Sequence, residues 1–191
     1  MLQVLEQPAI QTAAPRVTGE ELAEMGNIGR CELVEGEIIM LSPTGWRHGD
    51  FELQAGYALK RFVDGRNLGK VLVGEVGIYT GRNPDTVRGA DVIFISHARL
   101  AQVKSASFLD VAPELVVEVL SPDDRWMEVQ RKLNEYFAIG VVRVWLVDPS
   151  NRSVSVYRSP REMHVIDSHG ALDGEEILPG FSVPVSEFLP D

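Results

Sequence analysis

The sequence predicts an α/β fold built on a mixed sheet, and three observations favour it. Apolar residues recur at helical spacing from His48 to Asp64. Two strongly apolar, β-branched segments follow, Leu115–Leu120 and "VVRVWLVD" after Gly140, and both have the character of strands covered on two faces. A second helical pattern lies between them, so strand, helix and strand predict a βαβ unit with parallel strands and a right-handed crossover.

The N-terminal part predicts a short helix and a hairpin. Thr18 and Glu21 have the spacing of a capping box, and the helix "GEELAEM" ends near Gly26. "CELVEGEIIML" predicts two short strands joined by a tight turn at its Glu-Gly pair. The long helix that follows is expected to end at Gly65, because glycine favours the C-cap conformation.

The middle of the chain predicts a second, longer hairpin. "KVLVGEVGIYT" (residues 70–80) and "ADVIFIS" (residues 90–96) have strand patterns. The segment "GRNPDTVRG" between them contains turn residues, so we expect a long tip. Asp91 would then lie at the beginning of the second strand.

The second helix and the C-terminal strands complete the elements. Ser121 is the expected N-cap, Pro122 the first helical position, and the helix extends to about Ala138. Beyond the βαβ unit, "DPSNRS" predicts a turn and "VSVYR" a hairpin strand. "LPGFSVPVSEFL" predicts a short strand and a docked terminal segment. Trp126 and Trp145 are expected in the core.

The core order is therefore helix, strand, strand, strand, helix, strand, with the N-terminal hairpin and C-terminal strands as additions. We interpret residues 1–17 as a loose tail and residues 18–191 as a single domain. A chain of 191 residues with 45% hydrophobic and 24% charged residues suits one such domain.

Charge and composition restrict the function classes. The formal net charge of -10 argues against a protein that binds nucleic acid through a general basic excess, although a local basic groove stays compatible with it. Cys31 is the only cysteine, so an intrachain disulfide is excluded and a cytoplasmic location is expected. The opening residues lack a signal-peptide pattern, and no apolar run is long enough to cross a membrane.

Glu118 interrupts the apolar strand at Leu115–Leu120, and a buried carboxylate needs a partner. If the strands that carry Asp91 and Glu118 are neighbours, the two acids can face one another. A divalent cation with oxygen ligands would relieve their repulsion, and Mg²⁺ suits two carboxylates, water and phosphate oxygens. The alternative interpretations are a solvent-facing Asp91 and a buried ion pair between Glu118 and Arg143.

Such a site also needs a cation that orients water or balances phosphate charge. Lys132 lies just off the apolar arc of its predicted helix, so its amine can reach the end of the neighbouring strand. Arg125 lies at the same edge and is the second candidate. The alternative for Lys132 is a solvated pair with Glu128, four residues earlier.

Several segments together resemble a known family: "CELVEGEII", "SPTGWRH", "ADVIFI", "PELVVEVLSPDD", "KLNEYFAIGVVRVWLVDP" and "LPGF". The chain, over roughly residues 18 to 189, resembles the Uma2-type restriction endonuclease family of the PD-(D/E)XK nuclease superfamily. The resemblance implies a restriction-endonuclease-like core and metal-dependent hydrolysis of DNA phosphodiester bonds.

The resemblance also implies roles for individual residues. Asp91 matches the Asp of the PD half, Glu118 the acid of the ExK half, and Lys132 the lysine supplied by the following helix. Ala90 stands where the family usually has Pro, and Leu120 fills the position of the ExK lysine. Two residues, Glu32 in "CELVEGE" and His48 after "SPTGWR", look like additional active-site positions.

The sequence thus favours an endonuclease that uses Mg²⁺, or Mn²⁺ instead, held by Asp91 and Glu118, with DNA as the substrate and Lys132, Glu32 and His48 assisting. A homodimer would provide two sites for two strands. The alternative functions are a nuclease-like domain that binds DNA or a protein without cleaving, and a structural or dimerisation protein.

Overall fold

The computed structural model describes residues 16–190. Of the predicted tail, residues 1–15 lie outside this part, whereas the Val17 N–H donates a hydrogen bond to the Gly36 carbonyl. The helices are α1 (Gly19–Glu24), α2 (Trp46–Arg66), α3 (His97–Leu100), α4 (Trp126–Ile139) and α5 (Val185–Phe188). None of these helices combines the length and apolar character that crossing a bilayer requires.

The described strands form one large mixed sheet and one small one. The large sheet contains β1 (Cys31–Val34), β2 (Glu37–Met40), β3 (Gly69–Gly81), β4 (Thr86–Ser96), β5 (Leu115–Val119), β6 (Arg143–Asp148), β7 (Ser153–Ser159) and β8 (Glu162–Asp167). Its order is β2-β1-β4-β5-β6-β7-β8, with β3 paired to β4. The small sheet pairs β9 (Ala171–Asp173) with β10 (Ser182–Pro184).

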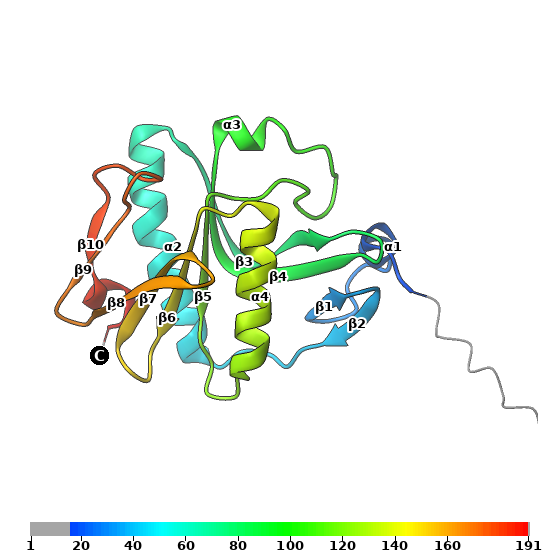
Figure 1. The fold of residues 1–191 in the computed structure, drawn as a ribbon, viewed down its shortest axis with the longest axis horizontal. Helices are drawn as coiled ribbons and strands as arrows, with labels where there is room; N and C mark the ends of the chain where they lie inside the picture. The colour runs from blue at the N-terminus through cyan, green and yellow to red at the C-terminus, as the bar shows by residue number, and fades with distance from the viewer. Residues whose placement is uncertain (1–15, 191) are drawn as a thin grey trace, which may run out of the picture.

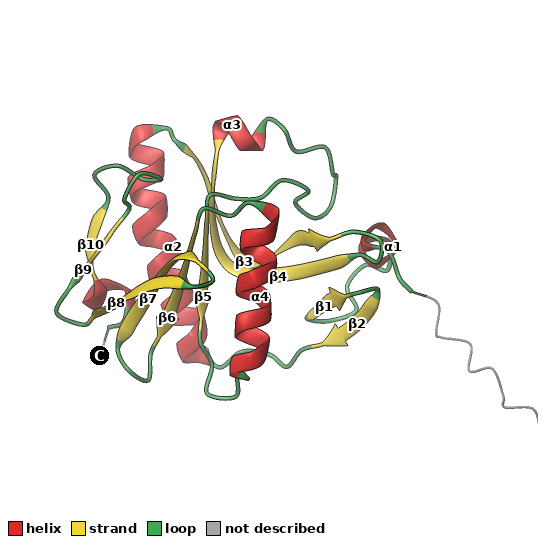
Figure 2. Cartoon of the chain, viewed as in Figure 1, coloured by secondary structure: helices red, strands yellow, loops and turns green. Residues whose placement is uncertain are grey.

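Helices cover the two faces of the large sheet (Figures 1 and 2). The βαβ unit is confirmed, because β5 and β6 are parallel and α4 connects them, while the other paired strands of the described residues are antiparallel. On β5, Leu115, Val117 and Val119 pack in the core beneath α2, and Val116 packs in the core beneath α4. The period-two alternation therefore divides this strand between two separate hydrophobic cores.

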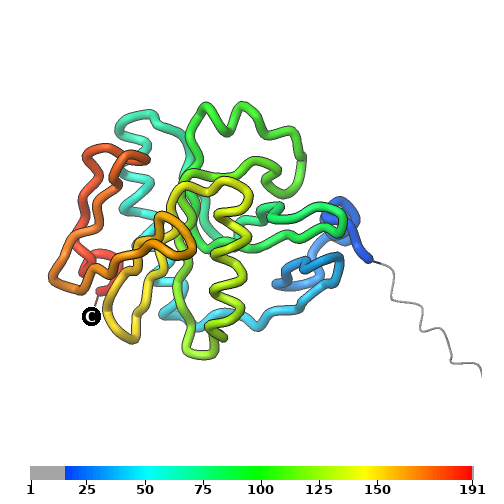
Figure 3. The backbone as a smooth tube through the Cα atoms, viewed as in Figure 1, coloured from blue at the N-terminus to red at the C-terminus, as the bar shows by residue number. Residues whose placement is uncertain are grey.

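The N-terminal elements match their sequence signals. The Thr18 hydroxyl accepts the Glu21 N–H and the Glu21 carboxylate accepts the Thr18 N–H, which completes the predicted capping box. The predicted hairpin is β1–β2, and it joins the sheet through the pair Leu33↔Val87 of β1 and β4. This hairpin and α1 lie at the far end of the long β3–β4 ribbon, as the backbone tube in Figure 3 shows.

The long tip predicted between the two middle strands is wrong. β4 begins at Thr86, and a turn over residues 82–85 connects it to β3. "TVRG" reads as loop by composition, yet Thr86 to Gly89 pair with β3 and are buried. Asp91 consequently lies inside a long buried strand, not at its entrance.

Two predicted helix ends are also wrong. α2 continues past Gly65, and Asn67 caps it in the left-handed conformation at φ 51° and ψ 48°. α4 begins at Trp126, not at Pro122. The Asp124 carboxylate accepts the Ser121 N–H at 2.8 Å while the Asp124 N–H donates to the Ser121 carbonyl, and this turn keeps residues 121–124 out of the helix.

The tryptophans differ from one another. Trp145 is 1% exposed and lies in the core as predicted, whereas Trp126 is 53% exposed, so its assignment to the core is wrong. The late start of α4 explains the error, because it places Trp126 at the open first turn of the helix. β8 was not predicted, since "EMHVID" alternates too weakly to be recognised.

The C-terminal segment closes the core beneath α2. Phe181 is fully buried, with its ring centroid 5.8 Å from Trp145 and 5.3 Å from Phe62. Phe188 contacts the same tryptophan at 6.1 Å. The segment that follows β8 is therefore part of the main core.

We expect Phe181→Ala to lower the free energy of unfolding by about 3 kcal/mol, because it removes a buried ring between two others. Urea unfolding measures the change, and Val165→Ala on an exposed position of β8 is the control, with a change within about 0.5 kcal/mol. Equal stability of the two variants would contradict the assignment of Phe181 to the core.

Candidate active site

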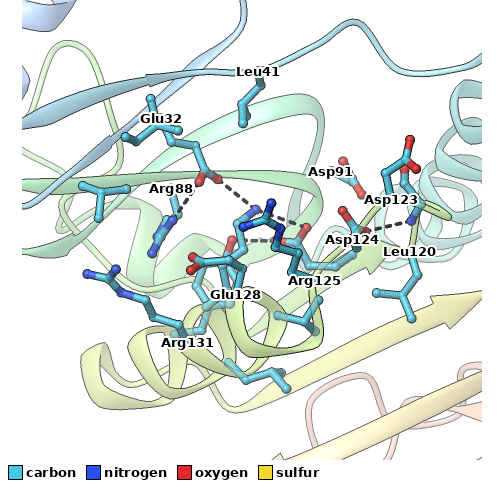
Figure 4. A pocket seen from close by; sticks show the side chains of 18 of the residues that line it. Glu32, Leu41, Arg88, Asp91, Leu120, Asp123, Asp124, Arg125, Glu128 and Arg131 are labelled. Atoms are coloured by element: carbon cyan, nitrogen blue, oxygen red, sulfur yellow. Dashed lines mark hydrogen bonds and ion pairs between the residues drawn. The ribbon is translucent and has the colours of Figure 1, made fainter.

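A cavity of about 630 Å³ lies between the β1–β2 hairpin and α4. Figure 4 shows its lining, with Glu32 and Arg88 on one side and the residues that lead into α4 on the other. The five residues singled out from the sequence all line it: Glu32, His48, Asp91, Glu118 and Lys132. They come from β1, α2, β4, β5 and α4, so the fold gathers them from across the chain.

Asp91 lies where β4 and β5 part. The pairing of the two strands ends at Val92↔Val117, and beyond it the Asp91 Oδ2 accepts the Val119 N–H at 2.7 Å. The side chain thus replaces a backbone acceptor at the end of the ladder. Asp91 is 3% exposed, so the alternative of a solvent-facing carboxylate is wrong.

His48 approaches Asp91 from the first turns of α2. Its Nε2 lies 3.4 Å from the Asp91 Oδ2 and 3.1 Å from the Val119 carbonyl oxygen. Because the carbonyl is an acceptor, Nε2 carries the proton. The hydrogen bond with Asp91 raises the pKa of His48 against the opposing effect of burial. The buried His48 Nδ1 has no partner within residues 16–190.

Glu118 lies on the α4 side of β5. The Tyr136 hydroxyl donates to its Oε1 at 2.6 Å, and the Lys132 Nζ lies 3.7 Å from its Oε2. Burial raises the pKa of Glu118 to about 8, and the charge of Asp91 adds to the rise against the effect of Lys132. The expected alternative partner, Arg143, pairs instead with two acids of the C-terminal segment.

Lys132 is held by anions and a carbonyl. Its Nζ lies 2.8 Å from the Glu32 Oε1 and donates to the Gly89 carbonyl at 3.2 Å. Burial alone would lower the pKa of Lys132, but Glu118 and Glu32 outweigh it, so the pKa lies above its ordinary value. The solvated pair with Glu128 is not among the ion pairs of the described residues.

Glu32 is the anchor of a buried ion network. Arg88, 3% exposed, donates to the Glu32 Oε2 at 2.8 Å and to both carboxylate oxygens of Glu135. Burial would raise the pKa of Glu32, yet Lys132 and Arg88 together hold it below its ordinary value. Glu32 is therefore an ionised group that fixes the Lys132 amine.

Sequence reasoning missed two acids beside Asp91. Glu52 lies one turn after His48 on α2, and ligand atoms of His48, Glu52 and Asp91 lie within 4.8 Å of one another. Glu75 sits in a β-bulge of β3 at φ 58°, between the register pairs on either side of Asp91, and forms an ion pair with Arg30. The i, i+4 spacing of His48 and Glu52 was a usable signal, whereas the bulge had none.

The donors around Asp91 fit a divalent cation. Carboxylate and carbonyl oxygens are the ligands of Mg²⁺ and Mn²⁺, and a neutral imidazole suits several transition metals. The three-residue group of His48, Glu52 and Asp91 does not include Glu118. A proton on the His48 Nε2 now bridges the Asp91 carboxylate and the Val119 carbonyl, and its loss would free that nitrogen as a ligand.

Comparisons with known proteins found one family and a similar solved structure. The model of the family Uma2, described as "Putative restriction endonuclease", matches residues 20–186. A solved structure from Anabaena variabilis, described as "a putative nuclease belonging to DUF820", is 19% identical and aligns with a TM-score of 0.75 over 90% of this chain and 97% of that chain. This likeness shows a shared fold. No curated protein matches the chain.

The raised pKa of Glu118 predicts a pH-dependent stability. The folded state keeps Glu118 protonated up to about pH 8, while the unfolded chain ionises it near 4.5, so its contribution to stability is lost as pH rises through this window. Glu118→Gln cannot ionise. Its Tm should exceed that of the wild type. This margin should widen from about pH 4.5 to about pH 8 and then stay constant.

Thermal unfolding followed by circular dichroism across this window measures the margin. Added Mg²⁺ or Mn²⁺ should narrow it, because a cation stabilises the ionised wild-type site. The exposed substitution Glu24→Gln is the control. A margin that does not change with pH would contradict the assigned protonation of Glu118.

Proposed function

The chain belongs to the Uma2 family, and from this premise we propose that it is a divalent-metal-dependent endonuclease that hydrolyses DNA phosphodiester bonds. The observation that carries the proposal is the meeting of Asp91, His48 and the Val119 carbonyl at one wall of a cavity that Glu118 and Lys132 also line. An acidic cluster beside a half-buried amine suits phosphoryl chemistry, in which negative charge must be held and oriented.

Asp91 and Glu118 would hold the cation, with His48 and Glu52 as neighbouring donors. Mg²⁺ is the proposed ion, and Mn²⁺ is the alternative because it tolerates an imidazole nitrogen beside carboxylates. When bound, the cation supplies Lewis-acid stabilisation of the phosphate and lowers the pKa of an attacking water. The same charge would counter both the burial and the repulsion from Asp91 that raise the pKa of Glu118.

The other side chains position and balance charge. Lys132 presents a protonated amine to the cavity and would stabilise negative charge on the phosphate. Glu32 and the Gly89 carbonyl fix that amine in place. The Tyr136 hydroxyl donates a hydrogen bond to Glu118 and so sets the orientation of that side chain. Arg88 keeps Glu32 ionised and is buried too deeply to meet a substrate directly.

We expect Asp91→Asn to abolish cleavage of DNA in Mg²⁺ or Mn²⁺, because it removes a charge that the cation requires. Incubation of the purified protein with single- and double-stranded DNA, analysed on a denaturing gel, measures the activity. Retained DNA binding without any cleavage by the wild type would instead favour a nuclease-like domain that binds without cutting.

Lys132→Ala should reduce the cleavage rate by about a hundredfold while metal binding is retained, since the amine stabilises charge on the phosphate. Lys60→Ala, an exposed lysine of α2, is the matched control and should cleave like the wild type. A rate unchanged by Lys132→Ala would remove this residue from the mechanism. The homodimer stays a prediction that sedimentation equilibrium measures.

A further inference from the structure

Two exposed tryptophans occupy equivalent places at the start of the two long helices. Trp46 is the first residue of α2 and is 78% exposed, and Trp126 is the first residue of α4 and is 53% exposed. Leaving an indole ring in water forgoes a large gain in burial, and exposed tryptophans commonly mark binding surfaces. Neither ring takes part in the proposed chemistry.

Both helix starts border the candidate active site. His48 is the third residue of α2, and its ring contacts the Val119 carbonyl. This contact connects the start of the helix to the end of β5. Residues 120–125, which connect β5 to α4, line the cavity in large part. In Figures 1 and 3 the first turns of the two helices lie at the same edge of the molecule, on either side of this connection.

An arginine adjoins each of these tryptophans in the sequence. The Arg47 guanidinium lies 5.3 Å from the ring centroid of Trp46, and Arg125 precedes Trp126 and lines the cavity. Neither arginine appears among the ion pairs formed within residues 16–190. By contrast, Arg88 and Lys132 of the cavity are neutralised by carboxylates.

The charge distribution favours single-stranded over duplex nucleic acid as the ligand. A duplex presents phosphates outward and its binding favours a broad basic surface, whereas this chain has a net charge of -10 and pairs Arg88 and Lys132 of the cavity with carboxylates. A single strand also offers unpaired bases, which stack on aromatic rings largely without regard to sequence. Two exposed indoles, each with an arginine adjacent in the sequence, match this second kind of ligand.

We propose that Trp46 and Trp126 stack bases of single-stranded DNA and so lead an unpaired segment past the candidate active site. Arg47 and Arg125 contact the adjoining phosphates. The inference rests on the proposed function for the reaction at that site and assigns its substrate class, an unpaired strand. Binding itself requires no catalysis, so it can be measured apart from cleavage.

Tryptophan fluorescence tests the proposal directly, because Trp145 is buried and a change must come from the two exposed rings. The wild-type protein in EDTA is titrated with a short oligothymidylate and, separately, with a blunt duplex of equal length. The single strand should quench the fluorescence and bind at least about tenfold more tightly than the duplex. Equal affinity for the two probes would overturn the proposal.

Variants identify the rings, with affinity followed by the anisotropy of a labelled oligonucleotide. Trp46→Ala and Trp126→Ala should each weaken binding of the single strand by about tenfold, and Trp126→Phe should retain most of it. Tyr57→Ala is the matched control, since Tyr57 is an exposed aromatic of α2 with Arg61 5.7 Å from its ring centroid. Tryptophan variants that bind like the wild type, or an equal loss in Tyr57→Ala, would overturn the proposal.

Cleavage separates this proposal from the proposed function. Single-strand binding that depends on the two tryptophans, without cleavage in Mg²⁺ or Mn²⁺, supports the stacking surface and contradicts the nuclease assignment. Cleavage of a blunt duplex as fast as of a single strand, unaffected by either tryptophan variant, supports the nuclease and contradicts the stacking surface.

Discussion

Carboxylates brought into the end of a buried sheet impose the constraint on which this structure depends, because each must be neutralised, protonated or bound. Asp91 accepts a backbone N–H and lies beside a histidine, Glu118 is protonated because burial raises its pKa, and Glu32 is matched by two cations. These solutions require groups from both helices and from the hairpin. The arrangement of the elements therefore also determines which groups compensate each carboxylate.

The two sides of the site are compensated unequally. On the α4 side, Arg88 and Lys132 form ion pairs with Glu32 and Glu135. On the α2 side, Glu52 has a raised pKa from burial and from the charge of Asp91, with a histidine as the nearby base. The α2 side of the cavity therefore carries an excess of acid, whereas the α4 side carries an amine that is paired with carboxylates.

Much of this arrangement could be read from the sequence, because the signals were local or periodic. The apolar run around Glu118 and the helical pattern around Lys132 placed each residue on a correct element. Long-range effects were hidden: Thr86 pairs as strand only because β3 provides the partner, and a bulge brings Glu75 to Asp91. Trp126 was misplaced because one aspartate turn delays the helix.

The attachment of the β1–β2 hairpin couples the position of one cavity wall to the position of the Lys132 amine. This hairpin carries Glu32, the carboxylate nearest to Lys132, and it is joined to β4 by the Leu33↔Val87 pair and by bonds from Arg88 and the Gly89 N–H to Glu32. A shift of the hairpin away from α4 would therefore widen the entrance and release the amine from its carboxylate in the same movement. One movement would thus both admit a bulky polymer and free a positively charged amine.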